Sequence, residues 1–349
     1  MSLSAPTLLI RHSPHLHSGT SVDSIMRDVV IALSPACAFS VFHFGLSAFL
    51  VLAVAVLSCV MTEHCLCLAM NRQTTIGDWS STITGLLYGM TLPPTLPLWM
   101  TFLGGMVAIG IGKSVFGGLG SNPFNPALVG RAFLQAAFPV AMTTWLVMPI
   151  NRLQTVAEST WALPLMAPQL SKESVDGLTT ATPLRYFHSN GTTTPSWDLF
   201  IGTVTGSVGE TSALFILLGG LYLISRKAMN WRIPAAILLT VALSSTVLHA
   251  WMPQQCPTAT FTLFSGGLML GAVFMATDMV ASPITHFGSV VYGVFIGSMV
   301  VVFRVWGGMP EGVMYAILLG NAVSPLIDRW IQPQPLGTAP HSRKAAPQP

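Results

Sequence analysis

The sequence predicts an all-α polytopic membrane protein, with about ten transmembrane helices in two five-helix inverted repeats that contain short or broken helices. Three observations lead to this prediction: an apolar composition, long stretches without charge, and glycine or proline interruptions at matching places in the two halves. Of 349 residues, 52% are hydrophobic and 8% are charged, whereas soluble domains carry about 25% charged residues. The composition therefore excludes a soluble enzyme, a disordered chain and a nucleic-acid binder.

Uncharged stretches define the candidate spans, and the longest, from Ile233 to Thr277, has 45 residues. A spanning helix needs about 20 residues, so the long stretches hold more than one helix. The third and eighth predicted segments are short, because one ends at Pro93-Pro94 and the other gives way to Asp278 and Pro283. The predicted segments are 28–44, 46–68, 80–93, 97–116, 124–144, 211–226, 232–252, 260–277, 286–304 and 311–331.

The distribution of Lys and Arg sets the predicted orientation. A cytoplasmic N-terminus puts eleven of these residues inside, Lys113 and Arg131 among them, and four outside. Both termini are then cytoplasmic. The predicted organisation is an N-terminal cytoplasmic segment (1–27), a first five-helix repeat (28–144), an external loop (145–210), a second five-helix repeat (211–331) and a disordered cytoplasmic tail (332–349).

The two halves resemble each other around paired glycines. Phe116-Gly117-Gly118 is matched by Trp306-Gly307-Gly308, 190 residues later. Five helices per half is an odd number, so the second half would be inserted in the opposite orientation. Inverted repeats with interrupted helices at matching positions place a binding site near the middle of the membrane.

The external loop contains the run Asp176-Gly177-Leu178-Thr179-Thr180-Ala181-Thr182-Pro183-Leu184. Taken by itself, this run is typical of a turn, because Asp-Gly starts turns and Thr hydroxyls cap helices. A Thr hydroxyl is a poor nucleophile, and nothing in the run would activate it.

Five longer motifs occur along the chain: SPHLHSG (13–19), GKSVFGGLGSNPFNPA (112–127), GSVGETSAL (206–214), SGGLMLGA with MATD (265–272 and 275–278) and GGMPEGV (307–313). With these motifs in this order, the chain resembles, from about residue 10 to 330, the family of the D subunit of the Rnf ion-translocating electron-transport complex. It is more distantly similar to the B subunit of sodium-pumping NADH:quinone reductase.

The resemblance implies a membrane flavoprotein subunit whose loop motif carries FMN, esterified through its phosphate to Thr182, with Asp176, Gly177 and Ala181 in the motif. A separate flavin transferase, using FAD, would attach it. The complex would pass electrons between ferredoxin and NAD while moving Na⁺ or H⁺ across the bacterial inner membrane, with the FMN loop outside. Its partners would be the other subunits and the lipid bilayer, and this subunit would not be active alone.

A phosphodiester keeps one negative charge, so a place outside the hydrocarbon suits it. Arg185, three residues after Thr182, is expected to pair with that charge. The hydroxyl of Thr182 is expected to be exposed beyond the lipid.

Asp278, Asn122 and Asn125 are the candidates for an ion pathway or for contact with a second, non-covalent flavin. Asp278 follows the 45 uncharged residues, and an acid at membrane depth is a functional candidate. The alternatives stay open: Asp278 as an ordinary interfacial acid, and the two asparagines as partners for backbone groups freed by a broken helix. Other functions to weigh are a secondary transporter and a non-redox scaffold. No complete metal site is visible in the sequence.

Overall fold

A computed structural model of the protein describes residues 21–333, except 73, 146–155, 165, 167–181, 192, 211, 254 and 308–310. Within these residues every regular element is a helix. Helix occupies each of the ten ranges that the sequence predicts, and the helix ends lie within a few residues of the predicted ones for most of them.

The first half contains five of the predicted segments. The fourth ends in a π-helical turn, and the fifth is divided at Phe138, because the following proline has no N–H to continue the helix. The elements are α1 (Val22–Phe44), α2 (Leu46–Ala69), the 3₁₀ turn η1 (Ile76–Asp78), α3 (Ser80–Met90), α4 (Leu98–Ile109), the π turn η2 (Gly110–Ser114), α5 (Pro126–Ala137) and α6 (Pro139–Thr143).

Short helices connect the halves: η3 (Glu158–Trp161), α8 (Pro183–Asn190), α9 (Ser196–Ile201) and η4 (Val208–Glu210). The second half has a broken eighth segment. Its elements are α10 (Ala213–Ser225), α11 (Arg232–Trp251), α12 (Ala259–Phe264), α13 (Leu268–Leu270), the π turn η5 (Gly271–Met275), α14 (His286–Val305) and α15 (Val313–Trp330).

Local chemistry explains where several helices begin. Ser21 and Ser24 form a reciprocal capping box at the start of α1, and the Thr285 side chain accepts from the Gly288 N–H at the start of α14. The Asn125 side chain accepts from the Ala127 N–H, with Pro126 in the first turn of α5. These side chains satisfy N–H groups that have no partner within the helix.

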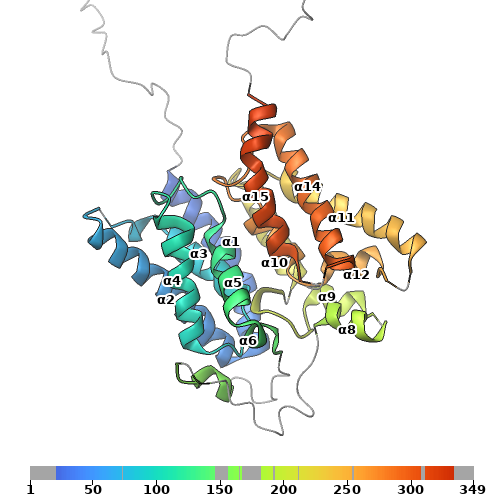
Figure 1. The fold of residues 1–349 in the computed structure, drawn as a ribbon, viewed down its shortest axis with the longest axis horizontal. Coiled ribbons are helices and arrows are strands. Elements are labelled where there is room, and N and C mark those ends of the chain that lie inside the picture. The colour runs from blue at the N-terminus through green and yellow to red at the C-terminus, as the bar shows by residue number, and fades with distance from the viewer. Residues whose placement is uncertain are drawn as a thin grey trace, which may run out of the picture.

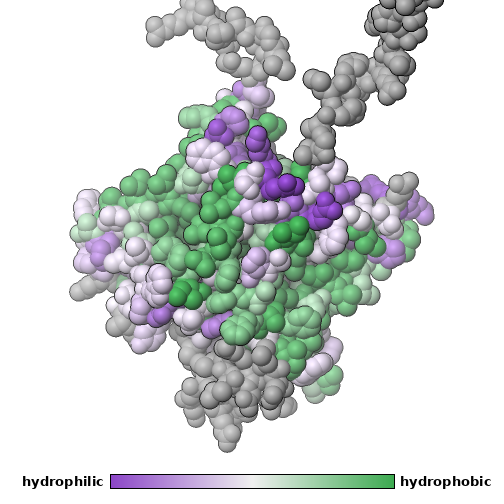
Figure 2. Space-filling view, turned by 180° about the vertical axis from the view of Figure 1, so that it is seen from behind, coloured by the Kyte–Doolittle hydropathy of each residue, from purple (hydrophilic) through white to green (hydrophobic). Residues whose placement is uncertain are grey.

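Four helices, α1, α2, α11 and α14, are long and apolar enough to cross a membrane, and α4 with η2 and α10 are shorter apolar helices. Large apolar side chains point outward along them; Leu57, Leu243 and Phe287 are each more than half exposed. Figure 2 shows apolar surface over the flank of the molecule, with hydrophilic residues gathered toward one end. This is the architecture of a polytopic membrane protein. That ten segments cross the membrane stays a prediction.

Packing recurs between the halves. In the first, α2 packs against α3 and α4, and α4 against α5; in the second, α11 packs against α12 and α14, and α14 against α15. Figure 1 shows the two groups side by side. Glycines allow close approach in both: a Cβ on Gly85 would lie 2.5 Å from the Val56 Cα, and one on Gly293 would lie 2.9 Å from the Ile233 carbonyl oxygen. The inverted orientation of the second group stays a prediction.

The two ends of the molecule differ. Helix α1 begins and α15 ends at the upper end in Figure 1, whereas α6 and α8 lie toward the lower end. Two polar sites lie inside the molecule, an outer site beside α8 and an inner site beside η2.

Candidate functional site

The outer site is a cavity of about 670 Å³ between the two halves. Thr182 lies in its wall, at the residue that precedes α8, and only 2% of it is exposed. The other walls come from α5, α6, α8 and the start of α15. They include Arg131, Thr143, Trp145, Arg185, Glu311 and Tyr315.

The burial of Thr182 corrects the prediction that its hydroxyl is exposed. The cause is the docking of α8, whose Leu184 and Phe187 are buried in a small apolar cluster with Leu199 and Phe261. The Phe187 and Phe261 rings lie 5.9 Å apart, centroid to centroid. Since Thr182 directly precedes α8, this packing carries its side chain inward.

Charged groups meet beside the Thr182 hydroxyl. That hydroxyl hydrogen bonds to the Glu311 carboxylate, and an Arg131 Nη2 atom lies 3.4 Å from Glu311 Oε2. Arg131 is buried, and its Nε has no hydrogen-bond partner among the described residues. Burial, and then the nearby Glu210 carboxylate, raise the pKa of Glu311 to about 7, although Arg131 opposes the shift.

A second buried arginine completes this group. Arg304 donates to the carbonyl of Thr262 and, at 2.9 Å, to the carbonyl of Ser265. Glu210 is buried, and its Oε1 has no hydrogen-bond partner among the residues described. We call Arg131, Glu210, Arg304 and Glu311 the outer charge cluster. It brings two arginines and two glutamates together, each close enough to influence the charge of another.

A glycine turn lets the backbone approach this cluster. Gly266 has φ +65°, and a Cβ there would lie 3.0 Å from Leu184 Cδ1 and 3.4 Å from Arg304 Nη2. A Cβ on Gly267 would lie 3.5 Å from Glu210 Oε1. A larger residue would therefore separate α8 from the charged groups.

The inner site is a cavity of about 130 Å³ that is lined by Asn122, Asn125 and Asp278 together. The Asn122 side chain hydrogen bonds to Asp278, which also accepts from the Val280 N–H at 3.2 Å. The Asn125 side chain donates to the carbonyl of Met275 at 3.2 Å, at the end of the π turn η5. This contact fits the alternative in which Asn125 satisfies backbone groups near a broken helix, and both alternatives for this residue stay predictions.

The family model of the NQR2, RnfD, RnfE family matches residues 9–337. The chain belongs to this family.

Three relatives of this family member cover nearly the whole chain. The D subunit of the proton-translocating ferredoxin:NAD(+) oxidoreductase complex of Clostridium ljungdahlii is 40% identical over 341 residues, 94% of this chain and 96% of the relative. The D subunit of the Na(+)-translocating complex of Acetobacterium woodii is 39% identical over 342 residues, 97% and 98% of the two chains. The D subunit of the ion-translocating oxidoreductase complex of Stutzerimonas stutzeri is 40% identical, over 91% and 93%.

In this member of the NQR2, RnfD, RnfE family, the predicted site residues divide into three sets. Thr182 and Arg185 share the outer cavity, and Arg185 is exposed. Asn122, Asn125 and Asp278 share the inner cavity. Asp176, Gly177 and Ala181 lie outside the described residues.

Sequence reasoning missed Arg131 and placed it on the cytoplasmic side. Arg131 lines the same cavity as Thr182, so the prediction that these two residues lie on opposite sides of the membrane does not hold for both. Lys113, assigned to the same side, is buried and lines the inner cavity. Both residues lie within or beside apolar helices, and an ionisable group at such a position is itself a signal of function.

Proposed function

We propose that the chain is a membrane flavoprotein subunit of an ion-translocating ferredoxin:NAD oxidoreductase complex and carries FMN esterified to Thr182. The observation that carries the proposal is the place of Thr182, in the wall of a cavity of about 670 Å³ and beside buried and exposed arginines. Membership of the family and relatives named as subunits of such complexes support it.

The cavity suits the group that it would hold. Arg131 and Arg185 line it and would bind the single negative charge of a phosphodiester, as guanidinium groups do. Trp145, Met314 and Tyr315 offer apolar surface to a flat ring. FMN, when bound, supplies reversible electron transfer. The residues of this chain would orient the group, keep water from it and balance its charge.

The test of this proposal is covalent labelling. In cells that also express the flavin transferase, we expect a fluorescent band on a denaturing gel, lost in Thr182→Ala and retained in Thr182→Ser. Thr143→Ala is the matched control, because Thr143 lines the same cavity and should leave the band unchanged. Mass spectrometry that finds the Thr182 peptide of the assembled complex unmodified would contradict the proposal and leave a transporter or a scaffold.

For the inner cavity, we propose the role in ion translocation or in binding a second, non-covalent flavin that the sequence predicts for Asn122, Asn125 and Asp278. Asp278→Asn should abolish ion transport while the covalent flavin stays attached. Flavin released by acid from the Thr182→Ala complex distinguishes the two roles, because only a second flavin would remain there. Unchanged ion flux in Asp278→Asn would remove this residue from the pathway.

The proposed setting is the bacterial inner membrane, with both termini in the cytoplasm and the outer cavity on the far side. The ends of α1 and α15 at one end of the molecule, and α8 toward the other, support this orientation. The proposed partners are the other subunits, the lipid bilayer and the transferase. Relatives of 40% and 39% identity are named for protons and for Na⁺ respectively, so identity does not choose the ion.

A further inference from the structure

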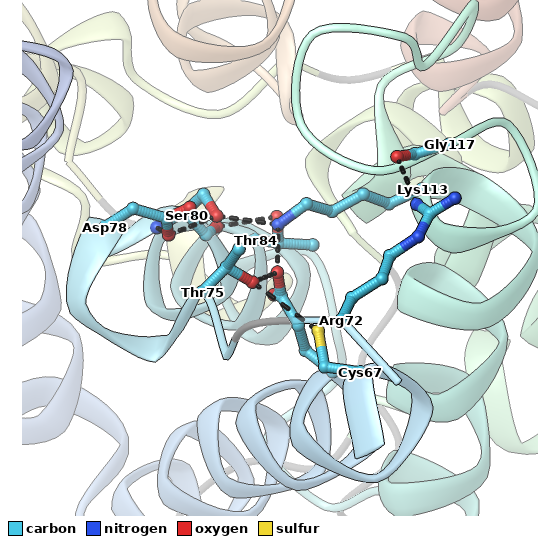
Figure 3. A network of polar contacts seen from close by, with 9 residues as sticks. Cys67, Arg72, Thr75, Asp78, Ser80, Thr84, Lys113 and Gly117 are labelled. Carbon is cyan, nitrogen blue, oxygen red and sulfur yellow. Dashed lines mark hydrogen bonds and ion pairs between the residues drawn. The ribbon is translucent and has the colours of Figure 1, made fainter. Parts of the chain in front are cut away.

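A lysine is buried where three elements of the first half meet. Lys113, in η2, is 3% exposed, and its Nζ lies 2.7 Å from an oxygen of Glu63, whose side chain is 6% exposed. The same Nζ donates to the Ser80 hydroxyl, at the first residue of α3, at 2.6 Å. Figure 3 shows the ammonium group of Lys113 at the centre of this network of polar contacts, beside Ser80 and Thr75.

Among the described residues, the hydrogen-bond partners of this ammonium are oxygens. Glu63 Oε1 also accepts from the Thr75 hydroxyl at 2.5 Å, and the Ser80 hydroxyl donates to Asp78 at 2.6 Å. The second carboxylate oxygen of Glu63, Oε2, is buried and has no hydrogen-bond partner among the described residues. A carboxylate with hydroxyl groups is the oxygen donor set that hard cations prefer. Lys113 therefore occupies a position that a small metal cation could take.

The pair has a high desolvation cost. A buried ion pair is often no more stabilising than apolar residues of the same shape, and ionisable groups within apolar helices usually serve transport or proton transfer. A structural role alone would be met more simply by apolar packing. The π turn that carries Lys113 is also typical of functional sites, because such turns insert an additional residue into a helix.

Lys113 has a second acidic group within its surroundings. It lines the inner cavity of about 130 Å³ together with Asn122 and Asp278. Its side chain is flexible and carries a compact charge, so on leaving Glu63 it would enter the cavity that Asp278 also lines. The other side of the ion pair adjoins the connection between α2 and α3, in which Thr75 and Asp78 are partly exposed. This connection gives a cation a polar route to Glu63.

We propose that Glu63, with the hydroxyls of Thr75 and Ser80, forms a binding site for a small monovalent cation, and that Lys113 fills this site until the cation displaces it toward Asp278. The inference rests on the proposed role in ion translocation and names a site for it in this subunit. Na⁺ and H⁺ share the chemistry, since each neutralises Glu63 in place of the ammonium. The cation and the Lys113 ammonium exclude each other at one carboxylate, which is how a translocated ion can be coupled to a change of state.

The test measures thermal unfolding of the purified complex in NaCl against choline chloride, at constant ionic strength and over a pH series. A ligand that binds the folded state raises the unfolding temperature according to its concentration. For Na⁺, we expect Lys113→Gln to lower the half-saturating concentration at least tenfold, since the competing ammonium is gone. If the ion is H⁺, we expect the unfolding temperature not to change with Na⁺. Lys113→Gln should then raise, by at least one pH unit, the pH at which the unfolding temperature changes on the acid side.

Two further variants test whether the responses to Na⁺ and pH depend on the Glu63–Lys113 pair. Glu63→Gln with Lys113→Gln replaces the ion pair by a neutral pair of similar shape and should lose both responses. Arg226→Gln is the matched control, because Arg226 pairs with Asp28 at 3.1 Å on the rim of the molecule and should change neither. Equal Na⁺ and pH responses in the wild type, Lys113→Gln and the double variant would overturn the proposal. Flavin fluorescence at Thr182, measured on the same samples, should stay unchanged. A failure of the cation-site proposal can therefore be told apart from a failure of the flavin proposal.

Discussion

Arg131 and Glu311 are 180 residues apart in the chain, yet their side chains meet at 3.4 Å beside the hydroxyl of Thr182. One residue belongs to α5 and the other to the connection before α15, so the contact joins the two halves of the protein. The predicted flavin carrier therefore lies at the boundary between the halves. A change of charge there acts on both of them.

Arg131→Gln should destabilise the flavin-loaded protein more than the unloaded protein. Removal of one partner from a buried ion pair costs about 3–5 kcal/mol, and the phosphodiester would then face Glu311 without this cation. Thermal unfolding of both forms, with Thr182→Ala as the permanently unloaded form, measures the difference. Arg185→Gln is the control: Arg185 is exposed, and exposed charge pairs contribute about 1 kcal/mol or less. A larger effect in Arg185→Gln would make that residue the main phosphate partner.

Glu311 should make the unloaded protein more stable in mild acid. Its pKa is raised from 4.5 to about 7, so the folded state holds the proton more tightly than the unfolded state does. This contribution is complete below pH 4.5 or so, and it is lost as the pH rises through about 7. A shift of this size corresponds to at most about 3 kcal/mol. Glu311→Gln should flatten the dependence of the unfolding temperature on pH across this window.

Burial is the main cause of the raised pKa of Glu311, and neighbouring charges adjust it. Arg131 lowers the pKa of Glu311, whereas Glu210 raises it. Glu210→Gln should therefore move the transition to lower pH and Arg131→Gln should move it to higher pH. If the transition moves in the same direction in both variants, Glu311 is not the titrating group.

Much of the fold could be predicted because every segment that crosses the hydrocarbon must be apolar and must satisfy its own backbone hydrogen bonds. The uncharged stretches predicted the helix positions, and the prolines predicted that the third and eighth segments are short. The break inside the eighth segment, at Gly266 and Gly267, was not predicted. The division of the fifth segment at Pro139 follows from proline chemistry and was within reach of the sequence. Local rules suffice for such features, because each depends on neighbouring residues only.

The outer site could be predicted only in part. Thr182 and Arg185 lie in one short motif, so the sequence brings them together. The pairing of Arg131 with Glu311 depends on how two distant helices pack, and the burial of Thr182 depends on contacts of Phe187 with Phe261. The count of basic residues assumes that each charge lies in water at a helix end, whereas Arg131 and Lys113 are buried.

The docking of α8 should control access of the flavin transferase to Thr182. Only 2% of this residue is exposed, so we expect the transferase to reach the hydroxyl while α8 is displaced, either before α8 docks or when it opens. Phe187→Ala removes the aromatic contact with Phe261 at a cost of about 3–5 kcal/mol. A time course with purified unloaded protein, transferase and FAD should show labelling at least tenfold faster in this variant. Tyr186→Ala is the matched control, because Tyr186 is 43% exposed on the same helix. Equal rates for wild type and Phe187→Ala would mean that the transferase reaches Thr182 with α8 in place.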